Sequence, residues 1–155
     1  MTIWVDSDSL PRDLRTILLR RQGRDLWPGE PMNLRFVAGR HLPDIPPALE
    51  IMVEPGPDAA DEAILASARP GDLVVTRDIP LANRAVSSGL ACINDRGDVF
   101  AESTVGERLS LRDAAAELRL LGMAPASPKG NSRTSKDVKR FADALDRTLA
   151  GLRRK

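Results

Sequence analysis

The chain has 155 residues, enough for one domain with a continuous core, and its 42% hydrophobic content excludes a disordered chain. The 23 Lys and Arg residues nearly balance the 22 Asp and Glu residues, so the net charge of +1 does not by itself predict nucleic-acid binding. The single cysteine, Cys92, excludes an internal disulfide and a Cys-rich zinc site. The N-terminus has neither a basic stretch nor an apolar run that could span a bilayer. We therefore expect a cytoplasmic protein without a membrane segment.

Strand and helix patterns alternate along the first two thirds of the chain. Short apolar stretches rich in β-branched residues predict strands, and apolar residues at helical spacing after a capping residue predict helices. The predicted strands are 3–5, 34–37, 49–53, 73–76 and 91–94, and the predicted helices are 11–22, 58–68 and 79–88. This alternation with short connections predicts a three-layer α/β fold with a mostly parallel central sheet flanked by helices.

The last third of the chain predicts two more helices. Residues 109–121 form an amphipathic pattern, and 135–152 a basic helix. The polar segment 124–134 between them is a candidate for a flexible linker. No second domain is indicated, so we expect residues 1–155 to form a single domain.

Several aspartates fall where predicted strands end. Asp6 and Asp8 follow the first strand, Asp58 and Asp61 follow the third, and Asp78 follows the fourth. Because ligands of open parallel sheets bind outside the carboxyl ends of the strands, we expect these side chains to meet in one cleft. Clustered carboxylates repel one another unless a cation holds them, and Mg²⁺ or Mn²⁺ prefers oxygen ligands. The alternative for each aspartate is a helix N-cap, which needs only a local hydrogen bond.

The chain contains six sequence motifs that together are typical of one family. They are I-W-V-D-S-D-S-L-P at 3–11, G-P-D-A-A-D at 56–61, R-P-G-D-L-V-V-T-R-D-I-P-L-A at 69–82, D-R-G at 95–97, G-E-R-L-S-L-R-D at 106–113 and R-F-A-D-A-L-D-R at 140–147. With these motifs the chain resembles, over nearly its whole length, the YaiI/YqxD family, which belongs to the PIN-like fold group. One difference is that the family pattern D-A-D-A-C-P reads D-S-D-S-L-P here, so its cysteine is absent, although both aspartates remain.

The resemblance implies a site as well as a PIN-like fold. The T-x-D-x-x-L-A element at 76–82 is similar to the stretch of PIN nucleases in which an aspartate after a strand belongs to an acidic metal site. By that resemblance Asp6, Asp8, Asp58, Asp61 and Asp78 are metal ligands. We expect Asp6, Asp8 and Asp78 to be catalytic.

Four further residues are candidates for substrate binding. The hydroxyl of Thr76 could orient Asp78 or contact a ligand, although a β-branched residue at a strand end also needs no such role. Arg96, Arg108 and Arg112 could bind phosphates, because a guanidinium group matches phosphate geometry through paired donors. Their alternative is an ordinary surface position or an ion pair with a neighbouring carboxylate.

Three functions are compatible with these residues. The first is a nuclease that depends on Mg²⁺ or Mn²⁺ and acts on RNA, with the aspartates as ligands. The second is a non-catalytic RNA-binding or ribosome-associated module that uses the basic C-terminal helix. The third is a phosphatase with Asp6 as covalent nucleophile, but that chemistry needs a downstream lysine and no lysine occurs before Lys129. The oligomeric state cannot be predicted.

Overall fold

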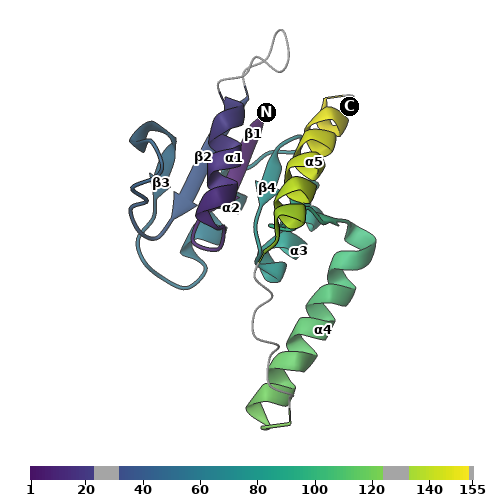
Figure 1. Ribbon diagram of the computed structural model, residues 1–155. Coiled ribbons are helices and arrows are strands. Elements are labelled where there is room, and N and C mark those ends of the chain that lie inside the picture. Colours follow the sequence, from purple (N-terminus) through teal and green to yellow (C-terminus); the bar gives the residue numbers. More distant parts are fainter. Residues whose placement is uncertain (23–31, 124–132, 154–155) are drawn as a thin grey trace.

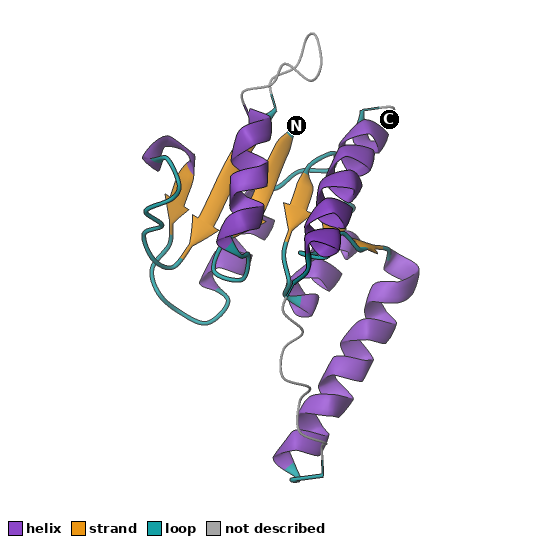
Figure 2. Cartoon of the chain, viewed as in Figure 1, coloured by secondary structure: helices purple, strands orange, loops and turns teal. Residues whose placement is uncertain are grey.

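The computed structural model of the chain describes residues 1–22, 32–123 and 133–153. Within these ranges the chain forms six strands, five α-helices and one short 3₁₀ helix (Figures 1 and 2). In chain order the elements are β1 (Thr2–Asp6), α1 (Arg12–Gln22), β2 (Asn33–Ala38), η1 (Pro47–Leu49), β3 (Glu50–Met52), α2 (Ala59–Ser67), β4 (Leu73–Val75), α3 (Ile79–Ser87), β5 (Ala91–Ile93), β6 (Val99–Phe100), α4 (Glu102–Leu120) and α5 (Ser135–Leu152).

The strands form one sheet in the order β3-β2-β1-β4-β5-β6. All neighbouring pairs are parallel except β5 and β6, which are antiparallel. The chain builds the sheet outward from β1 in one direction, then returns to place β4 on the other side of β1. The strand order therefore reverses between β1 and β4, and ligands of open α/β sheets bind at the carboxyl ends of strands beside such a switch point.

Helices cover both faces of the sheet. Figure 1 shows α1 and α5 on the near face, with α2 and α3 behind the sheet. Successive residues of β1 point to opposite faces, as the two-residue period of a strand requires. Ile3 and Val5 pack in the core beneath α1 and α5, whereas Trp4 packs in the core beneath α2 and α3. The result is a three-layer α/β fold, as the sequence predicted.

The structure corrects three details of the prediction. The antiparallel strand β6 was not expected, because two residues are too few to show a period. The helix predicted over 109–121 begins seven residues earlier, at Glu102. The strand predicted over 49–53 is shorter at both ends, and a 3₁₀ turn precedes it. Residues 124–132 of the predicted linker lie outside the described residues.

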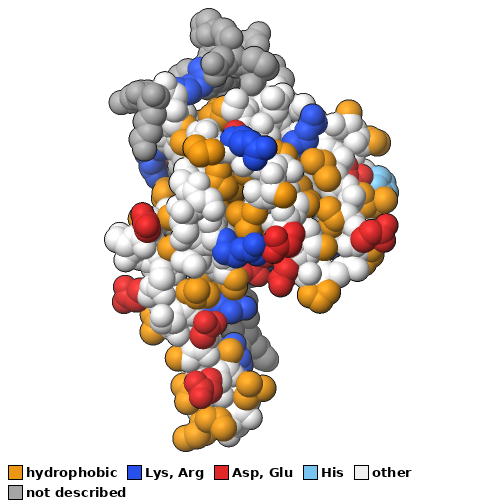
Figure 3. All heavy atoms as spheres, turned by 180° about the vertical axis from the view of Figure 1, so that it is seen from behind, with side chains coloured by type: hydrophobic (Ala, Val, Ile, Leu, Met, Phe, Trp, Pro, Cys, Tyr) orange, Lys and Arg blue, Asp and Glu red, His pale blue; other side chains and the backbone are white. Residues whose placement is uncertain are grey.

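Helix α4 projects away from the body of the molecule (Figure 1). Only its first turns reach the core, where Val105 is buried beside α3. Apolar side chains are visible at the end of the projection in the space-filling view (Figure 3). The exposed large apolar residues of α4 and of the turn after it are Leu111, Leu118, Leu120, Leu121 and Met123.

Candidate functional site

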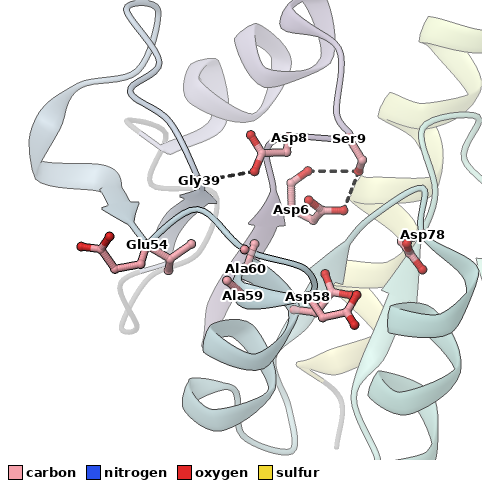
Figure 4. A pocket seen from close by; sticks show the side chains of 12 residues that line it. Asp6, Asp8, Ser9, Gly39, Glu54, Asp58, Ala59, Ala60 and Asp78 are labelled. Carbon is pink, nitrogen blue, oxygen red and sulfur yellow. Dashed lines mark hydrogen bonds between the residues drawn. The ribbon is translucent and has the colours of Figure 1, made fainter.

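A pocket of about 340 Å³ opens at the carboxyl edge of the sheet, beside the switch point between β1 and β4 (Figure 4). We call it the acidic pocket, because six of its lining residues are carboxylates. The five predicted aspartates all line it. Its lining residues are Asp6, Asp8, Ser9, Gly39, Val53, Glu54, Gly56, Asp58, Ala59, Ala60, Asp61 and Asp78.

Asp6 is the most buried of these carboxylates, with only 5% of its surface exposed. Two hydroxyl groups fix it in place. Thr76 Oγ1 donates to Asp6 Oδ2 at 2.7 Å, and Ser9 Oγ donates to the same oxygen at 2.6 Å. Among the described residues no group donates to Asp6 Oδ1, so this carboxylate is oriented through one oxygen while the other keeps its capacity to bind a ligand.

Thr76 connects the ends of β1 and β4. Its side chain is fully buried, and its hydroxyl donates to Asp6 while it accepts from the backbone N–H of Asp78 at 2.9 Å. It lies behind Asp6 and is not part of the pocket lining. Its geometry is therefore that of a positioning residue for Asp6, whereas the sequence analysis expected the hydroxyl to orient Asp78 or to contact a ligand.

The aspartates at the helix starts differ in what their side chains do. Asp78 caps α3, because its Oδ1 accepts from the backbone N–H of Leu81 at 3.2 Å. Asp58 occupies the N-cap position of α2 in the left-handed region, with φ of 57°, but its side chain makes no capping hydrogen bond. The cap alternative thus accounts for Asp78 and leaves the carboxylate of Asp58 unexplained by local structure.

Asp61 reports on the electrostatics of the acidic pocket. Its pKa is raised from 3.8 to about 6, first by burial and then by the negative charges of Asp6, Asp78 and Asp58. Burial alone would raise this pKa, but the contributions of the three charges mean that Asp6, Asp78 and Asp58 also lie near enough to repel Asp61. The residues that the sequence placed at three separate strand ends therefore act on each other through space.

Asp8 lies at the rim of the acidic pocket and is held from the β2 side. The backbone N–H of Gly39 donates to Asp8 Oδ2 at 2.8 Å (Figure 4), and Arg40 Nε lies 3.7 Å from Asp8 Oδ1. Glu54 is a further carboxylate of the lining that the sequence analysis missed. Its position two residues after β3 was the available signal, because it matches that of the other strand-end acids.

The donor set suits a hard divalent cation. Every charged group lining the acidic pocket is a carboxylate, and Mg²⁺ and Mn²⁺ prefer such oxygen ligands. The raised pKa of Asp61 indicates a repulsion that a cation would relieve. Within the described residues, however, no group of three His, Cys, Asp or Glu side chains is already arranged to hold a metal ion. The residues fit in chemistry, and their side chains would have to draw together around an ion.

The arginines predicted to bind substrate lie elsewhere. None of the three lines the acidic pocket. Arg96 lies in the turn between β5 and β6, where its backbone N–H donates to Asn94. Arg108 lies on α4, 3.7 Å from Asp98 Oδ2 and over the ring of Phe100. Arg112, further along α4, forms an ion pair with its neighbour Asp113 at 2.9 Å.

Fold and site together define a three-layer α/β protein with an acidic pocket at the switch point of its sheet. The chain belongs to the family described as "Uncharacterized BCR, YaiI/YqxD family", whose pattern it matches over residues 4–151. A "UPF0178 protein" of Treponema pallidum is 46% identical over 99% of this chain and 84% of its own length. Proteins of the same description from Myxococcus xanthus and Xanthomonas oryzae are 42% and 41% identical, over 98% and 96% of this chain and 96% and 89% of their own lengths.

Two further comparisons bear on the chain. No solved structure is significantly similar to it. Among the described residues, no helix has both the length and the apolar character that crossing a membrane requires.

Proposed function

We propose that the chain is a metal-dependent nuclease that uses Mg²⁺ or Mn²⁺ to hydrolyse phosphodiester bonds, with RNA as its substrate. The observation that carries the proposal is the meeting of five aspartates from three strand ends in one pocket at the switch point of the sheet. A cluster of carboxylates that repel one another is costly unless it serves to bind a cation. The resemblance to PIN-like proteins supports the same reaction class.

Asp6 and Asp78 are the residues best placed to hold the cation, because hydrogen bonds fix both carboxylates at the ends of β1 and β4. Asp58 and Asp61 face them from the start of α2, and Asp8 closes the rim. When bound, the cation supplies Lewis-acid activation of water and of the phosphate. The hydroxyl of Thr76 bonds both to the Asp6 carboxylate and to the backbone N–H of Asp78. It therefore holds the Asp6 carboxylate in a constant position relative to the backbone of Asp78.

The experiment that tests the proposal replaces Asp78 by Asn. Asn caps helices as well as Asp does, so Asp78→Asn keeps the cap of α3 and removes the charge. We expect the wild-type melting temperature to rise with Mn²⁺, since a ligand that binds only the native state stabilises it. In the variant that rise is lost and RNA cleavage falls by more than about 100-fold, because even residues that merely orient ligands contribute about 10- to 100-fold.

The matched control is Asp113→Asn, which removes the same charge from the exposed surface of α4. It should leave both the response to Mn²⁺ and the cleavage rate at wild-type values. A melting temperature that does not respond to Mg²⁺ or Mn²⁺ up to millimolar concentrations would contradict the metal site. RNA binding without cleavage, unaffected by Asp78→Asn, would instead favour a non-catalytic RNA-binding or ribosome-associated module.

A further inference from the structure

Two exposed arginines flank the acidic pocket, and neither was singled out by the sequence. Arg40 follows Gly39, which lines the pocket beyond the end of β2, and its side chain is 75% exposed. Arg77 lies between Thr76 and Asp78 at the end of β4, and its side chain is 54% exposed. In the sheet order β2 and β4 lie on opposite sides of β1. The two guanidinium groups therefore belong to opposite flanks of the strand that carries Asp6.

Both arginines contact the turn that bears the rim of the pocket. Arg40 Nε lies 3.7 Å from Asp8 Oδ1. The backbone N–H of Arg77 donates to Ser9 Oγ at 3.3 Å, its Nη1 lies 3.5 Å from Ser9 O, and its Nε lies 3.3 Å from Asp95 Oδ2. The long ion pair of Arg40 with the partly exposed Asp8 contributes little stability, so Arg40 can exchange its partner for a stronger anion at low cost. Asp95 is more buried, but Arg133 Nη1 lies 3.8 Å from it, so Asp95 keeps a cation when Arg77 turns to another anion.

A polyanion that enters the acidic pocket meets strong repulsion unless cations on the rim offset it. Arginine is suited to this because its planar fork binds phosphate through paired hydrogen bonds. Two strand spacings of about 4.8 Å separate β2 from β4, so the strands that carry the two arginines are roughly 10 Å apart. Two long side chains at that separation can reach the phosphates on either side of one phosphodiester. A single phosphate over the pocket could not contact both arginines.

We propose that Arg40 and Arg77 bind the backbone phosphates that flank the phosphodiester over the acidic pocket. The polynucleotide then crosses the strand ends from β2 towards β4, and the pocket receives an internal linkage of the chain. This inference rests on the proposed function, because it takes the acidic pocket as the place of cleavage. It assigns to the pocket rim the phosphate contacts that the sequence had assigned to Arg96, Arg108 and Arg112.

Binding tests the inference independently of cleavage. The dissociation constant of a short fluorescent oligo(U) is measured by anisotropy, with EDTA present, over a range of salt concentrations. Arg40→Ala and Arg77→Ala should each raise the dissociation constant about tenfold and lower the slope of log K against log salt by about 0.7, the value for one phosphate contact on a single strand. The double variant should lose about twice that slope, roughly 1.4.

The matched control is Arg20→Ala, which removes an equal charge from the last turn of α1. Arg20 is exposed and lies at the end of α1 that points away from the carboxyl edge of the sheet (Figure 1), so its loss should change the dissociation constant by less than about twofold. Arg40→Lys and Arg77→Lys keep the charge and should keep the salt slope. Thermal melts show that each variant is folded.

A second measurement compares substrates. Bis(p-nitrophenyl) phosphate has one phosphate and no flanking neighbours. The ratio of kcat/KM for oligo(U) to kcat/KM for this small diester should fall about tenfold in each arginine variant. If neither substrate is hydrolysed, the proposed nuclease function fails, while the anisotropy data still report on the two arginines.

Two results would overturn the inference itself. One is an unchanged salt slope in both Arg40→Ala and Arg77→Ala, which would leave Arg40 as a counter-ion of Asp8 and Arg77 as a partner of Asp95. The other is a loss of binding in Arg147→Ala, on the exposed side of α5, that equals or exceeds the loss in the rim variants. That pattern would place nucleic-acid binding on the C-terminal helix.

Discussion

The carboxyl edge of the sheet contains the candidate metal ligands, and helix α4 contains two of the three candidate phosphate-binding arginines. The two regions differ in how tightly the fold holds these side chains. At the sheet edge, side chains from β1, β4 and the start of α2 converge on one pocket and are joined by short hydrogen bonds. On α4 a single residue, Val105, is buried, and the two candidate arginines pair with nearby acids.

The difference follows from what each pattern determines. Parallel strands bring their carboxyl ends to one edge, so residues that follow strands are brought together whatever lies between them in sequence. A helical period determines only that one side of a helix is apolar, and it does not say what covers that side. Convergence at the sheet edge was therefore predictable, and the surroundings of α4 were not.

At the sheet edge, the largest loss of stability should come from Thr76, which couples the ends of β1 and β4. Thr76→Val keeps the shape of the side chain but removes the donor to Asp6 and the acceptor for the N–H of Asp78. We expect the free energy of unfolding to fall by about 1–3 kcal/mol, the penalty for buried groups left without partners. RNA cleavage should fall about 10- to 100-fold, because Asp6 loses its orientation.

Thr76→Ser restores the hydroxyl and serves as the control. It should recover most of the cleavage rate while losing some stability through the missing methyl group. Denaturant titration and initial cleavage rates measure the two effects separately. Equal cleavage rates in Thr76→Val and wild type would show that the hydroxyl does not position Asp6. The side chains at the sheet edge would then be less dependent on one another than their hydrogen bonds indicate, and the difference from α4 would be smaller.

Asp61 offers an intermediate effect that depends on pH. Its pKa of about 6 in the folded protein lies above the ordinary value of 3.8, so the folded state holds the proton more tightly than the unfolded state does. The resulting penalty is absent below about pH 4, grows as pH rises to about 6 and is complete above that. Because the side chain is only partly buried, solvent screening reduces the penalty at pH 7 to about 1 kcal/mol.

Asp61→Asn removes this penalty and should stabilise the metal-free protein by about 1 kcal/mol at pH 7 and by little at pH 4. Melting curves at the two pH values, with EDTA present, provide the measurement. Added Mn²⁺ should stabilise the wild type more than the variant, since the cation relieves the same repulsion. Destabilisation at pH 7 would mean that Asp61 has a favourable local role that outweighs its repulsion by Asp6, Asp78 and Asp58.

The sequence predicts the fold and the candidate site only where apolar residues recur with the period of a strand or a helix. The buried strands alternate or run apolar, so the sheet and its acidic edge could be expected in advance. Strand β6 spans two residues and shows no period. The start of α4 was missed because Ser103, Thr104 and Gly106 are poor helix formers, and packing of Val105 on the core overrides that preference. Arg40 and Arg77 are exposed, and exposed positions leave no pattern.

The smallest effect is expected on α4. Leu111 and Leu118 are 65% and 43% exposed, so Leu111→Gln and Leu118→Gln remove little buried apolar area. Glutamine also has a helix propensity close to that of leucine. Each substitution should therefore change the free energy of unfolding by less than about 0.5 kcal/mol, as surface substitutions usually do. Chemical denaturation followed by circular dichroism measures the change.

The matched comparison is Leu145→Ala on α5, a fully buried position where the loss should be about 2–5 kcal/mol. The two helices have similar lengths, 19 and 18 residues, so the contrast isolates burial from helix formation. If the α4 variants instead lose more than about 1 kcal/mol, Leu111 and Leu118 are buried against another surface in solution. A loss that grows with protein concentration would show that this surface belongs to a second copy of the chain, because only an intermolecular contact makes stability depend on concentration.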